Sequence, residues 1–288
     1  MARGLAALPE AGITLVVNVA DDDLIHGLHV AADLDTVVYT LADLHGPAGW
    51  GRGDETWRVM AEMERLPGAD TSFRLGDLDL ATSLYRTGRL ASGDTLSSVT
   101  ADVCSGFGIG VEVLPATDDR LRTMVTVADG EIDFQTYVVR RRHRDPILGL
   151  RFSGAEQARP APGVLDSIES ADLVLIAPSN PVLSVWPILA VPGIEESIAA
   201  APAVAAVSPL ISGRALKGPA VEAMRSAGLS PDVVGVVEAY RGLITHLVID
   251  TSETGALPSD VEILRTDTMI AEPAASERLA REIVEWLS

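Results

Sequence analysis

The chain has 288 residues, of which 47% are hydrophobic, and its formal net charge at pH 7 is -19. A chain of this length and apolar content can bury a large core, so disorder is not the expected state. The negative charge repels phosphate backbones, and the longest apolar runs, such as residues 173–178, are far shorter than a membrane span of ~20 residues, so neither a nucleic acid partner nor a membrane partner is expected. The first residues lack the pattern of a secretory leader, and we therefore expect a cytoplasmic protein.

The first half of the chain predicts one buried strand followed mainly by helices. Residues 13–19 are rich in β-branched side chains and end in a polar turn, which is typical of a buried strand. The helical spacing of apolar residues recurs at 36–44, 54–66 and 96–106. Strand-like runs then appear at 124–127, 132–139 and 147–152, broken by Asp129-Gly130 and Asp145-Pro146. Such closely spaced turns indicate a small antiparallel insertion.

Strands and helices alternate again from about residue 160. Strands are predicted at 171–177, 203–208, 233–237, 246–250 and 261–264, and helices at 163–170, 193–200, 218–227 and 274–287. This alternation predicts a mostly parallel sheet covered on both faces. The fold class is therefore a Rossmann-like, doubly wound α/β protein, with a core at 1–111 and 161–288 and a small β-rich insertion at 112–160.

Carboxylates cluster after the first predicted strand. Asp21 and Asp22 follow it directly, and Asp33 and Asp35 come shortly before a predicted helix. Ligands of such sheets collect at the carboxyl ends of the strands. Carboxylates there are hard oxygen ligands, suited to magnesium that also touches a phosphate. The alternative is that these are solvated loop acids, with Asp33 or Asp35 capping a helix that begins at Thr36.

Other polar residues also follow predicted strands or turns. Arg74 precedes a Gly-Asp turn and can bind a phosphate or a ring carbonyl, or form an ordinary ion pair with Asp77 or Asp79. Ser179 and Asn180 follow the strand at 171–177, where small polar residues admit a phosphate, although turn chemistry explains them equally well. Lys217, the only lysine, either faces an anion or is solvated.

Cysteine and histidine give no metal motif. Cys104 is the only cysteine, which excludes an internal disulfide and a multi-thiolate zinc site, and we expect it to be a buried, inert thiol. His26 and His29 are three residues apart but belong to no metal-ligand pattern.

Several ordered sequence blocks together resemble one family, the 2-phospho-L-lactate transferases of the CofD type. They lie at residues 18–22, 33–41, 49–57, 74–81, 115–119, 177–181, 187–193 and 216–219, so the resemblance runs from about residue 11 to the C-terminus. It implies a transferase of coenzyme F-420 biosynthesis. The acceptor would be the deazaflavin Fo, 7,8-didemethyl-8-hydroxy-5-deazariboflavin, and the donor a guanosine diphosphate linked to lactate or enolpyruvate. The products would be GMP and F-420-0 or its dehydro form.

The resemblance also implies a cofactor, site residues and a homodimer. Magnesium is required in the family, and Asp21 and Asp35 match its metal-associated carboxylates, while Asp35 and Arg74 match positions that contact Fo. The catalytic candidates are Asp21, Asp22 and Asp35, of which Asp22 or Asp35 could also receive the proton of the attacking hydroxyl. The substrate-binding candidates are Asp35, Arg74, Ser179, Asn180 and Lys217.

Two features leave alternatives open. Regulatory relatives of the wider family bind a nucleotide sugar and carry Asp-Asp-Gly-Gly-Ser-Ser-Gly where residues 21–27 differ here, which favours the transferase. Family members also open with a strand and a glycine-rich phosphate loop, whereas residues 1–8 resemble the helix after that loop. We expect a start codon placed too late, the alternative being a paralogue that binds Fo without transferring.

Overall fold

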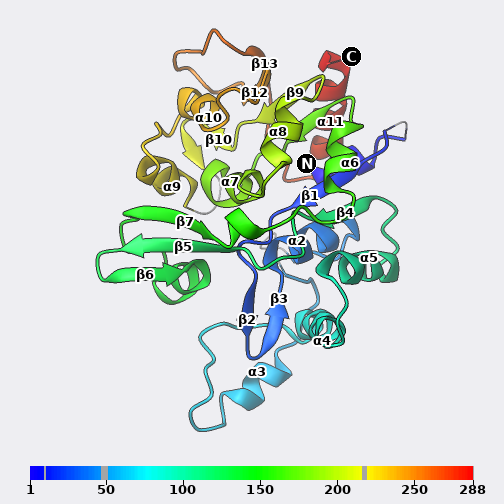
Figure 1. Cartoon of the computed structure of the whole chain (residues 1–288), viewed down its shortest axis with the longest axis vertical. Helices are drawn as coiled ribbons and strands as arrows, with labels where there is room; N and C mark the ends of the chain where they lie inside the picture. The colour runs from blue at the N-terminus through cyan, green and yellow to red at the C-terminus, as the bar shows by residue number, and fades with distance from the viewer. Residues whose placement is uncertain (10, 47–50, 216–218, 288) are drawn as a thin grey trace.

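The main sheet of the protein consists of parallel strands. The structure is a computed structural model that describes residues 1–9, 11–46, 51–215 and 219–287. Its largest sheet has the strand order β13-β12-β9-β8, with every neighbouring pair parallel. The strands are β8 (Val174–Ile176), β9 (Val204–Val207), β12 (His246–Asp250) and β13 (Glu262–Thr266). A second parallel pair, β1 (Thr14–Val17) with β4 (Glu112–Pro115), lies in the middle of the molecule (Figure 1).

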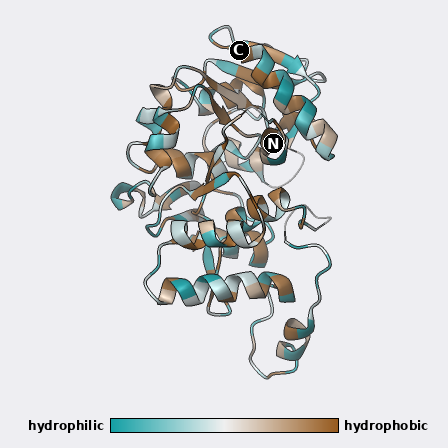
Figure 2. Cartoon of the chain, turned by 90° about the vertical axis from the view of Figure 1, so that its right-hand side faces the viewer, coloured by the Kyte–Doolittle hydropathy of each residue, from teal (hydrophilic) through white to brown (hydrophobic). Residues whose placement is uncertain are grey.

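The central strands of the main sheet are buried on both faces. Every residue of β9 is buried, as is every residue of β12 except His246. This explains why residues 204–207 and 247–249 are continuous apolar runs without polar alternation. Single helices carry both polar and apolar residues (Figure 2). In α11 (Pro273–Leu287), the apolar Leu279 packs in one cluster with Val207 and Val248 of the sheet.

Most of the remaining helices are short. They are α1 (Ala2–Ala6), α2 (Ala32–Leu41), α3 (Arg58–Met63), α4 (Asp77–Ala91), α5 (Leu96–Gly106), α6 (Val164–Glu169), α7 (Trp186–Leu189), α8 (Ile194–Ala199), α9 (Ala220–Ser226) and α10 (Val233–Ala239), with the 3-10 helix η2 (Ala155–Gln157) and the π-helices η1 (Thr136–Arg140) and η3 (Pro181–Val185). No described helix is long and apolar enough to cross a membrane.

Antiparallel strands project from this core. A three-stranded sheet has β5 (Arg122–Val127) between β6 (Gly130–Asp133) and β7 (Gly149–Ser153). The hairpin of β2 (Asp23–Ile25) and β3 (Leu28–Val30) extends toward α3 and α4, at the opposite end of the molecule from β13 (Figure 1). A short hairpin joins β10 (Leu210–Ile211) and β11 (Arg214–Ala215).

The predicted α/β class with a parallel sheet is confirmed. Observed strands overlap the strands predicted at 13–19, 171–177, 203–208, 246–250 and 261–264. The helix α5 has the predicted bounds. Cys104 is buried, and burial raises the pKa of its thiol to about 11. The strands β1, β9 and β12 were predictable because buried parallel strands are marked by β-branched apolar runs.

The strand predicted at 233–237 is wrong, because these residues form the helix α10. Asp232 caps this helix, since its carboxylate accepts the Gly235 N-H at 3.0 Å. A Cβ at Gly235 would lie 1.8 Å from the Ser230 carbonyl oxygen, so the close turn requires glycine. The cap and the glycine thus override the strand propensity of a valine-rich run.

Two boundaries and one further helix also differ from the predictions. The strand predicted at 132–139 ends at Asp133, whose carboxylate accepts the N-H and hydroxyl of Thr136 and starts η1. The helix predicted at 54–66 begins only at Arg58, where Asp77 accepts the N-H groups of Arg58 and Val59. The long helix α4 was not predicted.

The predicted insertion at 112–160 contains both kinds of strand. Its first strand, β4, pairs in parallel with β1, whereas β5, β6 and β7 form the antiparallel sheet over Arg122–Ser153. On strand pairing alone, the antiparallel unit therefore begins after β4. The division of the chain into core and insertion remains a prediction.

Candidate active site at the end of β1

Asn18 fixes the loop that follows β1 against the start of α2. Its side-chain amide donates to Asp33 Oδ2 at 2.9 Å, and its Oδ1 accepts the Ala20 N-H at 2.9 Å. The N-cap of α2 is Ala31, which makes no side-chain cap, so the alternative in which Asp33 or Asp35 caps a helix at Thr36 is wrong. Both acids instead lie in the first turn of α2, where the helix dipole favours negative charge.

Asp21 is a buried carboxylate with a free oxygen. Only 8% of the residue is exposed, and Oδ1 has no hydrogen-bond partner. Burial raises the pKa of Asp21 well above its usual value, and the charges of Asp33 and Asp22 add to the rise. The nearby Thr123 hydroxyl opposes it, although Thr123 Oγ1 has no partner in good geometry. A cation here would remove the cost that burial imposes.

Asp22 is paired with a histidine from the β2–β3 hairpin. His29 Nε2 lies 2.9 Å from Asp22 Oδ2, while Asp22 Oδ1 is buried without a partner. Burial raises the pKa of Asp22 to about 6, and the hydrogen bond from His29 opposes the shift. A carboxyl group with a pKa close to neutrality and one free oxygen suits proton transfer.

Asp35 is held by a buried arginine of α4. Arg86 Nη1 donates to Asp35 Oδ2 at 3.2 Å, and Arg86 Nη2 donates to Asp35 Oδ1. The Arg86 side chain is only 3% exposed. Burial raises the pKa of Asp35, and the Arg86 charge opposes the rise. This bidentate pair fixes the direction of the Asp35 carboxylate.

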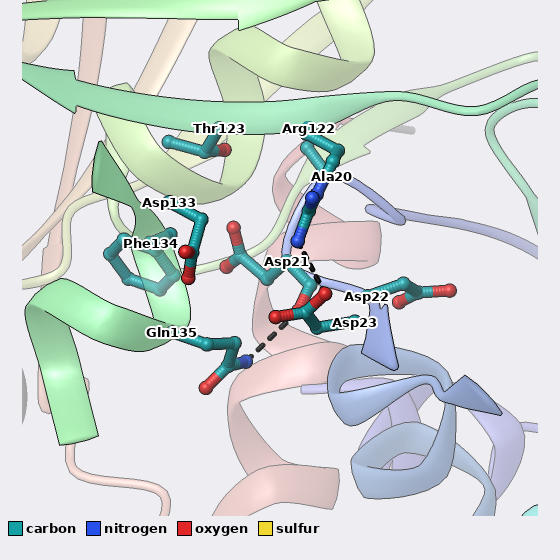
Figure 3. A pocket seen from close by; sticks show the side chains of 9 residues that line it. All are labelled: Ala20, Asp21, Asp22, Asp23, Arg122, Thr123, Asp133, Phe134 and Gln135. Carbon is teal, nitrogen blue, oxygen red and sulfur yellow. Dashed lines mark hydrogen bonds and ion pairs between the residues drawn. The ribbon is translucent and has the colours of Figure 1, made fainter. Parts of the chain in front are cut away.

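The Asp21–Asp23 loop borders a narrow pocket and a larger cavity. Asp21 faces the pocket, which is too narrow to hold a water molecule, together with Asp133, whereas Asp22 points away from it (Figure 3). Two contacts join residues that line the Asp21 pocket. Gln135 Nε2 donates to the Asp21 carbonyl oxygen at 2.9 Å, and Arg122 pairs with Asp23. Asp22 and His29 line the larger cavity, of about 320 Å³, whose remaining walls are Val19, Asp23, Leu24, Leu90, Leu96, Asp118, Asp119, Arg120, Leu121 and Arg122.

The donor set fits a hard divalent cation. Among the described residues no three His, Cys, Asp or Glu side chains are arranged as a complete metal site. Magnesium, however, usually takes one or two protein carboxylates and keeps several waters. Asp21 and Asp22 each present an unpartnered buried oxygen, whereas both oxygens of Asp35 already accept from Arg86. These free oxygens are therefore the strongest structural argument for a cation, and because Asp21 and Asp22 face different sides of their loop, each offers a single carboxylate ligand.

Arg74 lies on the segment of residues 51–76 that carries α3 and precedes α4, here called the α3 arm. Its guanidinium is 3.9 Å from Glu64 Oε1 and stacks 5.2 Å from the Trp57 ring centre. The alternative of an ion pair with Asp77 or Asp79 is wrong, because the described ion pair of Arg74 is with Glu64, and Asp77 instead caps α3. Within the described chain Arg74 shows no contact with the buried carboxylates, and its side chain is 52% exposed.

The residues after β8 are partly explained by local structure. Asn180 Oδ1 accepts the N-H groups of Val182 and Leu183 at 3.0 and 3.2 Å, so it caps η3. The Ser179 N-H donates to the Ala177 carbonyl oxygen at 2.7 Å. Lys217 lies outside the described residues.

Sequence reasoning missed the partners of the acids, notably His29, Arg86 and Gln135. Only the His26–His29 spacing drew attention to one of them, and it suggested no carboxylate partner. Arg86 is separated from Asp35 by 51 positions and carries no motif that would connect the two.

The family relationship is decided by comparison with known proteins. The model of the family described as "2-phospho-L-lactate transferase CofD" matches residues 1–278. The chain belongs to the CofD family. A protein named 2-phospho-L-lactate transferase from Methanopyrus kandleri is 40% identical over 287 residues, covering 98% of this chain and 92% of the relative. A protein named phosphoenolpyruvate transferase from Nocardia farcinica is also 40% identical, over 292 residues, covering 96% and 88%.

The fold is shared more widely. A member of the UPF0052 family from Bacillus halodurans superposes with a TM-score of 0.65 at 15% identity, covering 98% of this chain and 94% of that chain. At this identity the likeness shows the fold alone. The closer CofD-family matches are named as transferases, so the alternative of a nucleotide-sugar-binding regulator is not favoured.

Proposed function

We propose that this CofD-family protein transfers a phosphorylated three-carbon acid from its guanosine diphosphate adduct to the deazaflavin Fo, in coenzyme F-420 biosynthesis. The observation that carries the proposal is that Asp21 and Asp22 each have a buried oxygen without a partner, and that Asp22 lines a cavity of about 320 Å³. Relatives named for 2-phospho-L-lactate and for phosphoenolpyruvate support this substrate class. The proposed state of the protein is a cytoplasmic homodimer.

The chemistry is a phosphoryl-type transfer. The terminal ribityl hydroxyl of Fo attacks the phosphorus that bears the three-carbon acid, a new P–O bond forms, the bond to the GMP phosphate oxygen breaks, and GMP leaves. Bound magnesium supplies charge neutralisation for the diphosphate and the leaving group. Asp21 and Asp35 are the proposed magnesium ligands, of which Asp21 has a buried oxygen without a partner.

The remaining residues orient substrates and accept a proton. Asp22, with its pKa raised to about 6, can accept the proton of the attacking hydroxyl through Oδ1 while His29 holds Oδ2. Asp35 and Arg74 are proposed to contact Fo. Ser179, Asn180 and Lys217 are proposed to bind the donor, where N-H groups and a cation offset the repulsion between its phosphates and a protein of charge -19.

An end-point assay tests the proposal. Fo, magnesium and enzymatically generated guanosine diphosphate donors are incubated with this chain and with a version extended upstream, and GMP and the phosphorylated deazaflavin are followed by mass spectrometry. We expect both products in stoichiometric amounts, and a loss of at least about tenfold in an Asp21→Asn variant but not in Glu285→Gln, an exposed acid of α11. Binding of a nucleotide sugar without either product from either version would contradict the transferase.

A further inference from the structure

Two consecutive residues of α4 hold the backbone of His29. Arg86 Nη1 donates to the His29 carbonyl oxygen at 3.1 Å, and the His29 N-H donates to Thr87 Oγ1 at 2.8 Å. The Thr87 hydroxyl itself donates to the Ser83 carbonyl oxygen at 2.6 Å, which directs its lone pairs toward His29. Both backbone polar groups of His29 are thus fixed by one turn of a neighbouring helix.

The same arginine holds Asp35. Its guanidinium donates to both carboxylate oxygens, and only 3% of its side chain is exposed. A buried guanidinium is costly unless its donors are paired. The guanidinium is planar, and the same Nη1 donates to the His29 carbonyl oxygen and to Asp35 Oδ2, so the position of this carbonyl oxygen sets the direction in which Arg86 holds Asp35. The position of Asp35 on α2 is therefore coupled to the position of β3.

The position of the His29 backbone in turn determines the orientation of Asp22. Its Nε2 lies 2.9 Å from Asp22 Oδ2, so the backbone that α4 fixes carries the imidazole that orients Asp22. Asp22 lies on the loop after β1, and its partner His29 lies on β3. Asp35 lies on α2, and its partner Arg86 lies on α4. The helix α4 is the common support of both acids.

We propose that Arg86 and Thr87 are positioning residues that set Asp22 and Asp35 relative to each other for the transfer reaction. This inference rests on the proposed function and adds residues to that same site. Neither residue touches a substrate in this proposal. Misplacement of a reacting group by about 1 Å can cost about 100-fold in rate, so fixing two acids from one helix has a direct effect on turnover.

Arg86→Lys tests the arginine, and Arg89→Lys is its matched control. Lysine keeps the charge but cannot make the three contacts of the fork at once. Arg89 lies on the same helix and pairs with Asp94 and Asp102 at the surface, away from Asp22 and Asp35. At a temperature well below unfolding, we expect Arg86→Lys to lower kcat by about 10- to 100-fold with KM values within about threefold, and Arg89→Lys to change neither.

Thr87→Val and Thr87→Ser separate positioning from packing. Valine has the shape of threonine but no acceptor for the His29 N-H, whereas serine restores the hydroxyl. We expect kcat to fall about tenfold in Thr87→Val and to return to within about twofold of the starting protein in Thr87→Ser. Equal kcat in Thr87→Val and Thr87→Ser, or kcat within about twofold of the starting protein in Arg86→Lys, would overturn the inference.

A nitrogen NMR measurement keeps the inference testable without turnover. The Nε2 resonance of His29, assigned by its loss in His29→Gln, reports the contact with Asp22. We expect it to move in Arg86→Lys and in Thr87→Val and to stay in place in Arg89→Lys and Thr87→Ser. An unmoved resonance in both of the first two variants overturns the inference, whereas absence of product from the unaltered protein with a resonance that moves as expected overturns only the proposed function.

Discussion

His29 Nε2 lies 2.9 Å from Asp22 Oδ2, and the other oxygen of this carboxylate has no hydrogen-bond partner. The imidazole thus orients Asp22 while leaving Oδ1 available to a cation or a hydroxyl proton. Burial keeps the pKa of Asp22 at about 6 in spite of the histidine. The ionised Asp22 carboxylate therefore lowers the stability of the folded protein. A bound cation or a transferred proton would remove this cost.

Asp22→Asn should stabilise the protein above pH 6. Because the folded-state pKa of about 6 exceeds the ordinary value of 3.8, the unfolded chain loses this proton first as pH rises, and stability falls between those two values. Above pH 6 the full penalty is present. We expect the variant to gain about 1 to 3 kcal/mol in free energy of unfolding at pH 8 and less at pH 4.5.

Urea unfolding with a chelator at both pH values checks this expectation. The amide that replaces the Asp22 carboxylate can still meet His29, so the variant removes the charge with little change in shape. Glu285→Gln, at an exposed position of α11, should show no such pH-dependent gain. A gain of equal size at pH 4.5 and pH 8 would mean that the Asp22 charge is not the cause.

Magnesium should stabilise the folded protein through Asp21. A ligand at about 100 times its Kd adds about 2.7 kcal/mol to the free energy of unfolding. We expect a stabilisation of this order in the unaltered protein, and its loss in Asp21→Asn, which removes a carboxylate with a buried free oxygen. The quantity to compare is the shift caused by magnesium in each protein, measured by thermal or urea unfolding. The same shift in Asp21→Asn as in Glu285→Gln would place the cation elsewhere.

The sequence was informative about the acids and uninformative about what holds them. Asp21, Asp22 and Asp35 could be selected because they follow a recognisable buried strand, and strand ends gather ligands. Arg86 could not, because it lies inside a helix that was not predicted, and its partner Asp35 is 51 positions away. Likewise the valine run at the start of α10 carries a strand signal, and only the contact between Gly235 and Ser230 shows why it is helical.

Arg74→Ala should weaken acceptor binding with little effect on stability. The Arg74–Glu64 pair is half exposed and 3.9 Å long, so its removal should cost less than about 1 kcal/mol. If Arg74 contacts Fo, the KM for Fo should rise about tenfold, while kcat changes much less. Arg65→Ala is the matched control, because Arg65 pairs with Glu62 on the same arm. Equal KM values for Fo in the two variants would remove Arg74 from the binding site.

Asn180 can be tested for two roles at once, because capping and donor binding require different parts of its side chain. Capping uses Oδ1, which accepts the N-H groups of Val182 and Leu183. Asn180→Ala should therefore cost about 1 kcal/mol of stability, whereas Asn180→Asp keeps an acceptor and should keep the stability.

The effect of these variants on activity should differ from their effect on stability. An aspartate at position 180 would put a negative charge beside the diphosphate of the donor, so we expect Asn180→Asp to lower kcat/KM by about tenfold or more although it is folded as well as the starting protein. Unfolding curves and donor-dependent rates on the same samples provide the comparison. If Asn180→Asp were fully active as well as stable, capping of η3 alone would explain Asn180, and the donor phosphates would have to bind away from the end of β8.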